Sequence, residues 1–324
     1  IGVRLVGSEM CIRDRFNSGA FVVFIVLSVF VVECLMMDID IISVFPEYFR
    51  MLDLSLLGKA QNNGLLQIRA YNLRKWTHDV HQSVDDTPVG GGAGMVMKPE
   101  VWAECLDELL SLPKSEVKNT CDTCDSCEEA KIATNKIDST KPILIFPNPS
   151  APLFTQKDAT ELSNANHLVF GCGRYEGYDA RIPEYYRAQG IDVREYSIGD
   201  YVLNGGEVAV SVMLEAITRL IPGFMGNPES IVEESYTGSD ALLEHHQYTR
   251  PTTWRGISVP EILTSGNHAK VDRFRRDEAI SRTSEIRPDL IKKLDCHKLD
   301  KSDRKTLMSL GWEVSGEHPR KNCQ

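Results

Sequence analysis

The chain has 324 residues, of which 42% are apolar and 25% charged, a composition typical of a globular protein with room for two domains. Its formal net charge of −10 excludes a uniformly basic coat for nucleic acid. Nine cysteines scattered along a chain of this size exclude the disulfide framework of a small secreted protein, so we expect a cytoplasmic location.

Residues 1–36 differ in character from the rest of the chain. An apolar run over 20–32, AFVVFIVLSVFVV, is closed by Glu33 and is shorter than the roughly 20 residues of a membrane-spanning helix. No small-residue cleavage site of a signal peptide follows it. The preceding peptide VGSEMCIRDR resembles translated sequencing-adapter read-through. We therefore expect the natural protein to begin at Met36 or Met37, with a non-native leader before it and no membrane attachment.

From Met37 onward, short apolar segments alternate with amphipathic ones. MDIDIISVFPEYF (37–49) favours a strand that leads into a helix, and the further strands are expected at 64–73, 142–147, 167–172 and around 192–198. Helices are expected at 98–112, 155–164 and 207–220. Continuous apolar runs such as PILIFP are typical of parallel strands covered on both faces. This alternation predicts an α/β domain over 37–232 with a mainly parallel sheet.

A polar insertion interrupts this domain at residues 113–140, where Ser, Thr, Asp and Glu follow no apolar period. It carries a C-x-x-C-x-x-C run, Cys121, Cys124 and Cys127. A zinc or iron–sulfur site needs a fourth ligand, and no histidine or second C-x-x-C lies nearby. We therefore assign no metal ligands, and whether the insertion binds metal stays open.

The last quarter of the chain has a different composition. Residues 233–248 lack apolar periodicity and are expected to be a linker, and 249–324 to be a small, mostly α-helical domain with helices near 259–263 and 269–282. Between residues 248 and 293, ten Lys and Arg face six acids. This segment therefore suits a polyanion such as RNA.

Three glycine-rich loops stand out in the α/β domain, at 89–94, 171–177 and 197–206. Glycines let a ligand approach the backbone closely, so three such loops favour a nucleotide-like ligand. A phosphate-binding loop is excluded because no G-x-x-x-x-G-K-[ST] occurs. Dinucleotide binding is disfavoured because the spacing is G-x-G-x-x-x-G and bulky residues interrupt it, namely Arg174, Tyr175 and Glu176.

Four motifs resemble the bacterial TrmD family of tRNA (guanine-N1)-methyltransferases. They are VDDTPVGGGAGMVMKPE (84–100), CGRYEGYDAR (172–181), YSIGDYVLNGGE (196–207) and HQYTRPTTWRGISVPEILTSGNHAKVDRFRRDEAISRT (246–283). The resemblance implies a SPOUT-type parallel sheet with a deep trefoil knot, S-adenosylmethionine as methyl donor, a helical C-terminal domain and a homodimer. It also implies that the target is the guanosine 3′-adjacent to the anticodon.

The same resemblance assigns residues to the methyl-donor site. Ala151 stands where the family often has glycine, so the loop around Pro149 departs slightly from the pattern. The residues that match the family's donor motifs are Pro149, Gly173, Ile198, Gly199, Asp200, Tyr201, Val202, Leu203, Gly205 and Gly206.

Methylation at guanine N1 requires a general base for the N1 proton and a hydrogen-bond donor near O6, where negative charge develops. In the family the base is an aspartate before an H-Y-T-R-P-like motif, and the matching residue here is Glu244, with Asp240 as a nearby substitute. The extra methylene of glutamate moves the carboxylate by roughly 1.5 Å. Arg174 is the second catalytic candidate, and Arg250 is the alternative to it for a contact to O6 or phosphate. No arginine occurs in GFMGNPES, where the family has one near the donor.

RNA contacts are expected from the basic C-terminal segment, at Lys270, Arg273, Arg275 and Arg276. Asp85 and Asp86 either line the guanine pocket or start an ordinary turn.

Two other functions stay open, namely another SPOUT RNA methyltransferase and a non-catalytic RNA-binding relative. The YTRP to SGNH block argues against the first, whereas Glu in place of Asp at 244 leaves room for the second. A need for magnesium also stays open.

Overall fold

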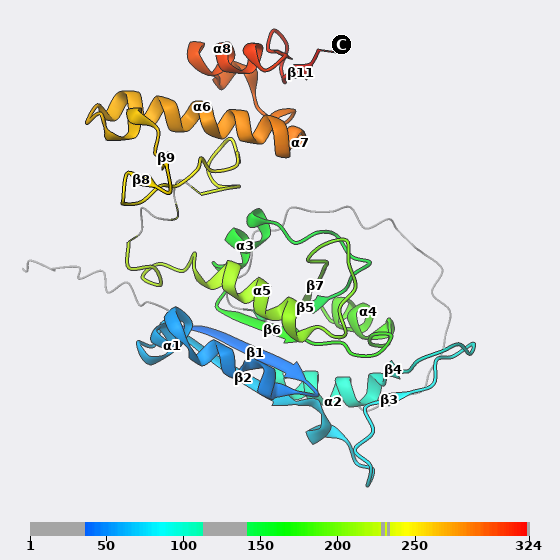
Figure 1. The fold of residues 1–324 in the computed structure, drawn as a ribbon. Coiled ribbons are helices and arrows are strands. Elements are labelled where there is room, and N and C mark those ends of the chain that lie inside the picture. Colours follow the sequence, from blue (N-terminus) through cyan, green and yellow to red (C-terminus); the bar gives the residue numbers. More distant parts are fainter. Residues whose placement is uncertain (1–35, 113–140, 228–230, 232–233, 323–324) are drawn as a thin grey trace, which may run out of the picture. The chain divides into compact units, whose positions relative to one another are not determined.

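The computed structural model describes residues 36–112, 141–227, 231 and 234–322. Five strands form one parallel sheet in the order β2-β1-β6-β5-β7 (Figure 1). The strands are β1 (Met37–Ser43), β2 (Leu66–Asn72), β5 (Ile143–Pro147), β6 (His167–Gly171) and β7 (Asp192–Tyr196). The structure thus confirms the α/β fold with a parallel sheet that the alternation of segments predicted.

Helices cover both faces of this sheet. In β5, Ile143 and Ile145 are buried on one side, whereas Leu144 and Phe146 are buried on the other. The first face is covered by the 3-10 helix η1 (Pro46–Asp53), α1 (Ser55–Asn62), α3 (Gln156–Leu162) and α5 (Glu207–Thr218). The second is covered by α2 (Pro99–Leu109) and α4 (Arg181–Ala188). Burial on both faces explains why the strands have continuous apolar runs.

Local sequence signals set several helix boundaries. Helix α3 begins at a capping box in which the Thr155 hydroxyl and the Asp158 carboxylate each bind the other residue's backbone N–H. Helix α2 begins at Pro99, whose missing N–H costs nothing in the first turn. The short 3-10 helix η2 (Leu73–Trp76) follows β2, and β3 (Asp85–Asp86) pairs antiparallel with β4 (Val96–Met97) around the first glycine-rich loop.

The C-terminal part encloses a buried cluster of its own, which includes Leu242, Ile280, Leu307 and Trp312. Its elements are a hairpin of β8 (Thr253–Trp254) and β9 (Ile257–Ser258), η4 (Glu261–Thr264), α6 (His268–Ile286), α7 (Pro288–Ile291), η5 (Cys296–Lys298), α8 (Lys301–Ser309), β10 (Trp312–Glu313) and β11 (Arg320–Lys321). The expectation of a helix at 259–263 is only partly met, because the segment forms a 3-10 turn shifted toward residue 264.

Candidate functional site

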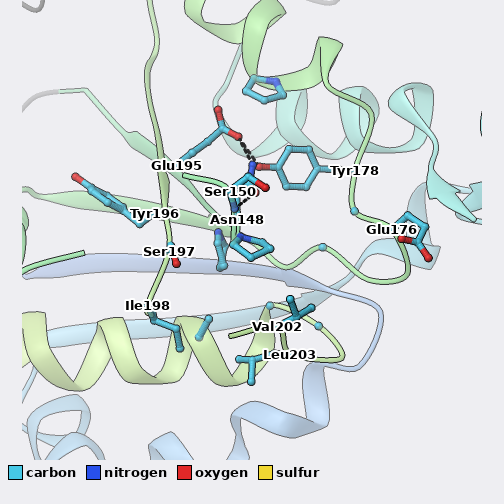
Figure 2. Close-up of a pocket in the computed structure, with 18 of the residues that line it drawn as sticks. Asn148, Ser150, Glu176, Tyr178, Glu195, Tyr196, Ser197, Ile198, Val202 and Leu203 are labelled. Carbon is cyan, nitrogen blue, oxygen red and sulfur yellow. Dashed lines mark hydrogen bonds between the residues drawn. The ribbon is translucent and has the colours of Figure 1, made fainter. Parts of the chain in front are cut away.

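A cavity of about 400 Å³ lies at the carboxyl ends of β5, β6 and β7, where ligands bind in open parallel sheets (Figure 2). It is formed by the loops that follow these three strands and by the start of α5. Its volume suits a small-molecule ligand. Eight of the residues matched to the donor motifs line it, namely Pro149, Gly173, Ile198, Tyr201, Val202, Leu203, Gly205 and Gly206. Gly199 and Asp200 belong to the same loop but are not among its lining residues.

Glycine is required where two of these loops meet. The Gly206 N–H donates to the Gly173 carbonyl at 2.9 Å, and a Cβ on Gly206 would lie 3.0 Å from the Cα of Cys172. Gly199 has a φ of +153°, and a Cβ there would lie 2.4 Å from the Tyr201 ring. Gly206 therefore lets the two loops touch through their backbones, and Gly199 lets the Tyr201 ring lie against the backbone of its own loop.

Arg174 projects away from this cavity into the protein. Its Nε donates to the carboxylate of Glu207 at 3.0 Å, and the same carboxylate accepts from the Ser43 hydroxyl at 2.7 Å. The side chain of Glu207 is only 1% exposed. The guanidinium also stacks on Phe45, 4.8 Å from its ring centroid. Arg174 is thus occupied within the fold and is not among the residues that line the cavity.

The two neighbours of Arg174 do reach the cavity. Tyr175 and Glu176 both line it. The backbone N–H of Glu176 donates to the Met95 carbonyl at 3.0 Å, and a Cβ on Gly94 would overlap the Glu176 side chain. The first glycine-rich loop therefore packs against the second. Asp86 accepts from the Thr87 N–H at 2.7 Å, the contact of an ordinary turn, and neither aspartate of the 85–86 pair lines the cavity.

The polar wall of the cavity was missed by the sequence reasoning. Glu195, at the end of β7, accepts hydrogen bonds from Tyr178 and Asn148, and all three line the cavity (Figure 2). Its position could have indicated a site residue, because Glu195 lies at the carboxyl end of a strand, directly before the donor motif.

Glu244 lines a second cavity, between the linker and helix α6. Its backbone N–H is held by the Ser235 hydroxyl at 2.9 Å, its carbonyl accepts from Arg282 at 3.1 Å, and its carboxylate accepts from Gln247. Asp240 lines the same cavity, but its carboxylate pairs with Arg276. Of the two acids, only Glu244 has a carboxylate without an ion-pair partner among the described residues.

The three α6 arginines predicted to contact RNA, Arg273, Arg275 and Arg276, fall into two groups. Arg273 and Arg276 both pair with Asp303, whose side chain is 7% exposed, at 2.8 and 2.9 Å. They hold α6 against α8, which does not favour the phosphate contacts predicted for them. Arg275 is 42% exposed, and its nearest acid, Asp272, lies 3.9 Å away. Arg275 also lines the same cavity as Arg250.

Among the described residues, no group of three or more His, Cys, Asp or Glu side chains is arranged to hold a metal ion. The Cys121, Cys124 and Cys127 run lies outside the described residues. No helix in the described part of the chain is long and apolar enough to cross a membrane.

Comparison with known proteins agrees with the resemblance carried by the four motifs. A model of the family described as tRNA (Guanine-1)-methyltransferase TrmD matches residues 37–293. A protein of Bifidobacterium animalis subsp. lactis, named tRNA (guanine-N(1)-)-methyltransferase, is 75% identical over 285 residues, which cover 88% of this chain and 99% of that protein. Proteins of the same name from Kineococcus radiotolerans and Thermobifida fusca are 48% and 50% identical and are covered over 93% and 98% of their lengths. The chain therefore belongs to the TrmD family of tRNA (guanine-1)-methyltransferases.

Proposed function

We propose that the protein transfers a methyl group from S-adenosylmethionine to N1 of the guanosine 3′-adjacent to the anticodon of tRNA. The observation that carries this proposal is the cavity at the ends of β5, β6 and β7, because the loops matched to the family's donor motifs converge on it. Family membership supplies the reaction type and the tRNA substrate.

The residues of the cavity fit such a donor. Ile198 and Leu203 supply apolar surface for a purine ring, and the backbone groups of the 197–206 loop can read its edge. Gly173, Gly205 and Gly206 keep the floor free of side chains. When bound, the donor supplies an electrophilic methyl group on a sulfonium. The protein then has to exclude water and align N1 with that methyl group.

Glu244 is the proposed general base that takes the N1 proton. A carboxylate has the chemistry for this step, and among the described residues that of Glu244 accepts a hydrogen bond from Gln247 and has no ion-pair partner. Arg250 is the better candidate for the contact to guanine O6 or to phosphate, because the guanidinium of Arg174 is already paired with Glu207. Neither role assigns a step to a bound metal ion.

Glu244 and the donor loops line different cavities of the chain, which supports a composite site in a homodimer. Apolar side chains are exposed along η1 and the outer face of α5, two elements that pack together, and such a patch is typical of a protein interface. The exposed residues are Phe45, Tyr48, Met51, Leu54, Val208 and Val212. In the dimer, Glu244 of one protomer would serve the donor cavity of its partner.

The knot and the location of the protein belong to the same proposal. The backbone bridge between Arg174 and Gly205 and the bond from Gly206 to Gly173 tie together the two loops that would form a trefoil knot. A cytoplasmic location follows from tRNA as the substrate.

The reaction is tested with purified protein, methyl-labelled donor and a tRNA transcript that has guanosine 3′ of the anticodon. We expect label in the RNA and 1-methylguanosine after digestion to nucleosides, and none with a transcript that has adenosine there. A label on a ribose or another base would support a different RNA methyltransferase, and tRNA binding without label would support a non-catalytic relative.

A further inference from the structure

Glu195 is the centre of a polar cluster in the wall of the donor cavity. One oxygen, Oε1, accepts from the Tyr178 hydroxyl at 2.8 Å and from the Asn148 side-chain amide at 3.0 Å. The other, Oε2, accepts from Arg187 at 2.7 Å. These four residues come from β7, from the loops after β5 and β6, and from α4, and all four line the cavity. Figure 2 shows Glu195 with Asn148 and Tyr178. One carboxylate thus joins three separate segments of the wall.

Asn148 connects Glu195 to the loop after β5. Its carboxamide oxygen accepts from the Ser150 N–H at 2.9 Å, and its own backbone N–H donates to the Tyr196 carbonyl at 2.9 Å. Pro149 lies between these contacts and lines the cavity. The amide group of Asn148 therefore fixes the turn that presents Pro149, and Glu195 fixes that amide group.

Tyr178 connects Glu195 to the loop after β6. Its ring packs on Phe146, with centroids 4.5 Å apart, and lies so close to Gly173 that a Cβ on this glycine would be 3.2 Å from the ring. The hydrogen bond to Glu195 sets where the ring lies. The Tyr178 ring thus supports Gly173, a residue of the donor motif, from behind.

The cluster is built around an ionised carboxylate. Burial raises the pKa of Glu195, but the hydrogen bonds from Arg187, Asn148 and Tyr178 outweigh burial and bring it below its ordinary value. Hydrogen bonds to a charged group are about twice as strong as neutral ones. Because Arg187 is 46% exposed, solvent screens its ion pair, whereas the bonds from Tyr178 and Asn148 connect Glu195 to the two loops.

We propose that Glu195 is a positioning residue that holds the loops after β5 and β6 in the geometry that binds the methyl donor. The proposal rests on the proposed function, since it assigns the cavity to the donor. Glu195 is given no part in proton transfer. Weakening the cluster therefore raises the dissociation constant and KM for the donor while kcat at saturating donor changes little.

The test compares Tyr178→Phe and Glu195→Gln with the wild type by calorimetric titration of the full-length protein with S-adenosylhomocysteine. Each variant is expected to bind at least about tenfold more weakly, because Tyr178→Phe removes one charge-assisted hydrogen bond and Glu195→Gln removes the charge that strengthens all three. Tyr186→Phe is the matched control, because the buried Tyr186 hydroxyl donates to the Asp107 carboxylate at 2.8 Å outside the cavity. It is expected to lower the melting temperature and to leave the dissociation constant unchanged.

A double-mutant cycle separates positioning from a general loss of stability. Tyr178→Phe with Glu195→Gln should be less than additive in the dissociation constant, whereas Tyr186→Phe with Glu195→Gln should be additive. Unchanged binding by both cavity variants would overturn the proposal while leaving the donor site in place. A fall in kcat with unchanged KM would also overturn it. Absence of binding by the wild type would instead refute the proposed function.

Discussion

The guanidinium of Arg174 lies 3.0 Å from the carboxylate of Glu207, at the point where the loop after β6 meets the start of α5. Both side chains are largely buried, at 15% and 1% exposed. The pair therefore connects the loop after β6 to the first residue of α5, on the side of these segments that faces away from the cavity. This pairing with a buried carboxylate favours a structural role for Arg174 over a contact with the substrate.

Arg174→Ala should lower the free energy of unfolding by about 3–5 kcal/mol, because it leaves the carboxylate of Glu207 buried without its cation. Urea denaturation measures this. Arg174→Ala combined with Glu207→Gln should recover part of the loss, since no buried charge remains. A variant with unchanged stability but weaker tRNA binding would show that Arg174 contacts substrate after all.

A second buried carboxylate predicts how stability depends on pH. Asp40, whose side chain is 4% exposed, accepts from Arg69 at 2.6 Å and His167 at 2.8 Å. Burial raises the pKa of Asp40, but the hydrogen bonds from His167 and Arg69 lower it below its ordinary value. Such a group stabilises the fold above its unfolded pKa, about 3.9, and this contribution is lost as pH falls through the folded-state pKa.

Asp40→Asn should therefore cost about 2–3 kcal/mol in urea unfolding at pH 7, somewhat less than a fully buried pair because Arg69 is 34% exposed. The difference from the wild type should shrink below the ordinary pKa of aspartate. Asp192→Asn is the control and should cost below about 1 kcal/mol, because the Asp192 carboxylate is 44% exposed and its partner Arg194 keeps Glu161 as a second partner. A pH-independent cost for Asp40→Asn would contradict this account.

The glycine-rich loops that line the cavity could be located in the sequence because their shape depends on the backbone, and glycines such as Gly205 and Gly206 mark such loops directly. The contacts of Arg174, Tyr178 and Glu195 could not be predicted, because the sequence does not show which residue a charged or phenolic side chain will bind in the folded protein. Glu207 lies 33 residues after Arg174 and reaches it only through the packing of α5.

The C-terminal part shows the same limit. Arg273 and Arg276 look like phosphate contacts in the sequence, but both pair with Asp303 on α8, and each has a further acidic partner, Asp277 for Arg273 and Asp240 for Arg276. The β8–β9 hairpin was missed because its strands have two residues each and its turn places Arg255, with a φ of +52°, where glycine or asparagine is usual. The parallel sheet could be predicted because strands that are buried on both faces have continuous apolar sequences.

The salt dependence of tRNA binding should distinguish Arg275 from Arg273 in α6. Arg275→Ala should weaken tRNA binding and reduce the slope of log K against log salt by about 0.9, as expected for one lost phosphate contact. Arg273→Ala should instead destabilise the fold and leave the slope unchanged. Filter binding from low to moderate salt measures both. Equal slopes for the wild type and Arg275→Ala would remove Arg275 from the RNA interface.

A composite site in a homodimer is tested by mixing two inactive variants. Glu244→Gln keeps the donor cavity intact, and Leu203→Trp fills it at a residue that is 40% exposed and so tolerates bulk. After subunit exchange, half of the dimers carry one intact cavity facing one intact Glu244, so activity should recover to about one quarter of the wild type. Full inactivity of the mixture, with exchange verified by mass spectrometry, would place Glu244 and the donor in one protomer.

The single-turnover rate of methyl transfer by Glu244→Gln, with donor and tRNA both saturating, tests the central claim most directly. Removing the general base should slow this step by about 10²–10⁴-fold while the dissociation constants for S-adenosylhomocysteine and tRNA stay within about twofold of the wild type. Glu244→Asp keeps the carboxylate and should retain most of the rate that Glu244→Gln loses. A Glu244→Gln protein that transfers methyl groups at a near-normal rate would show that another residue takes the N1 proton.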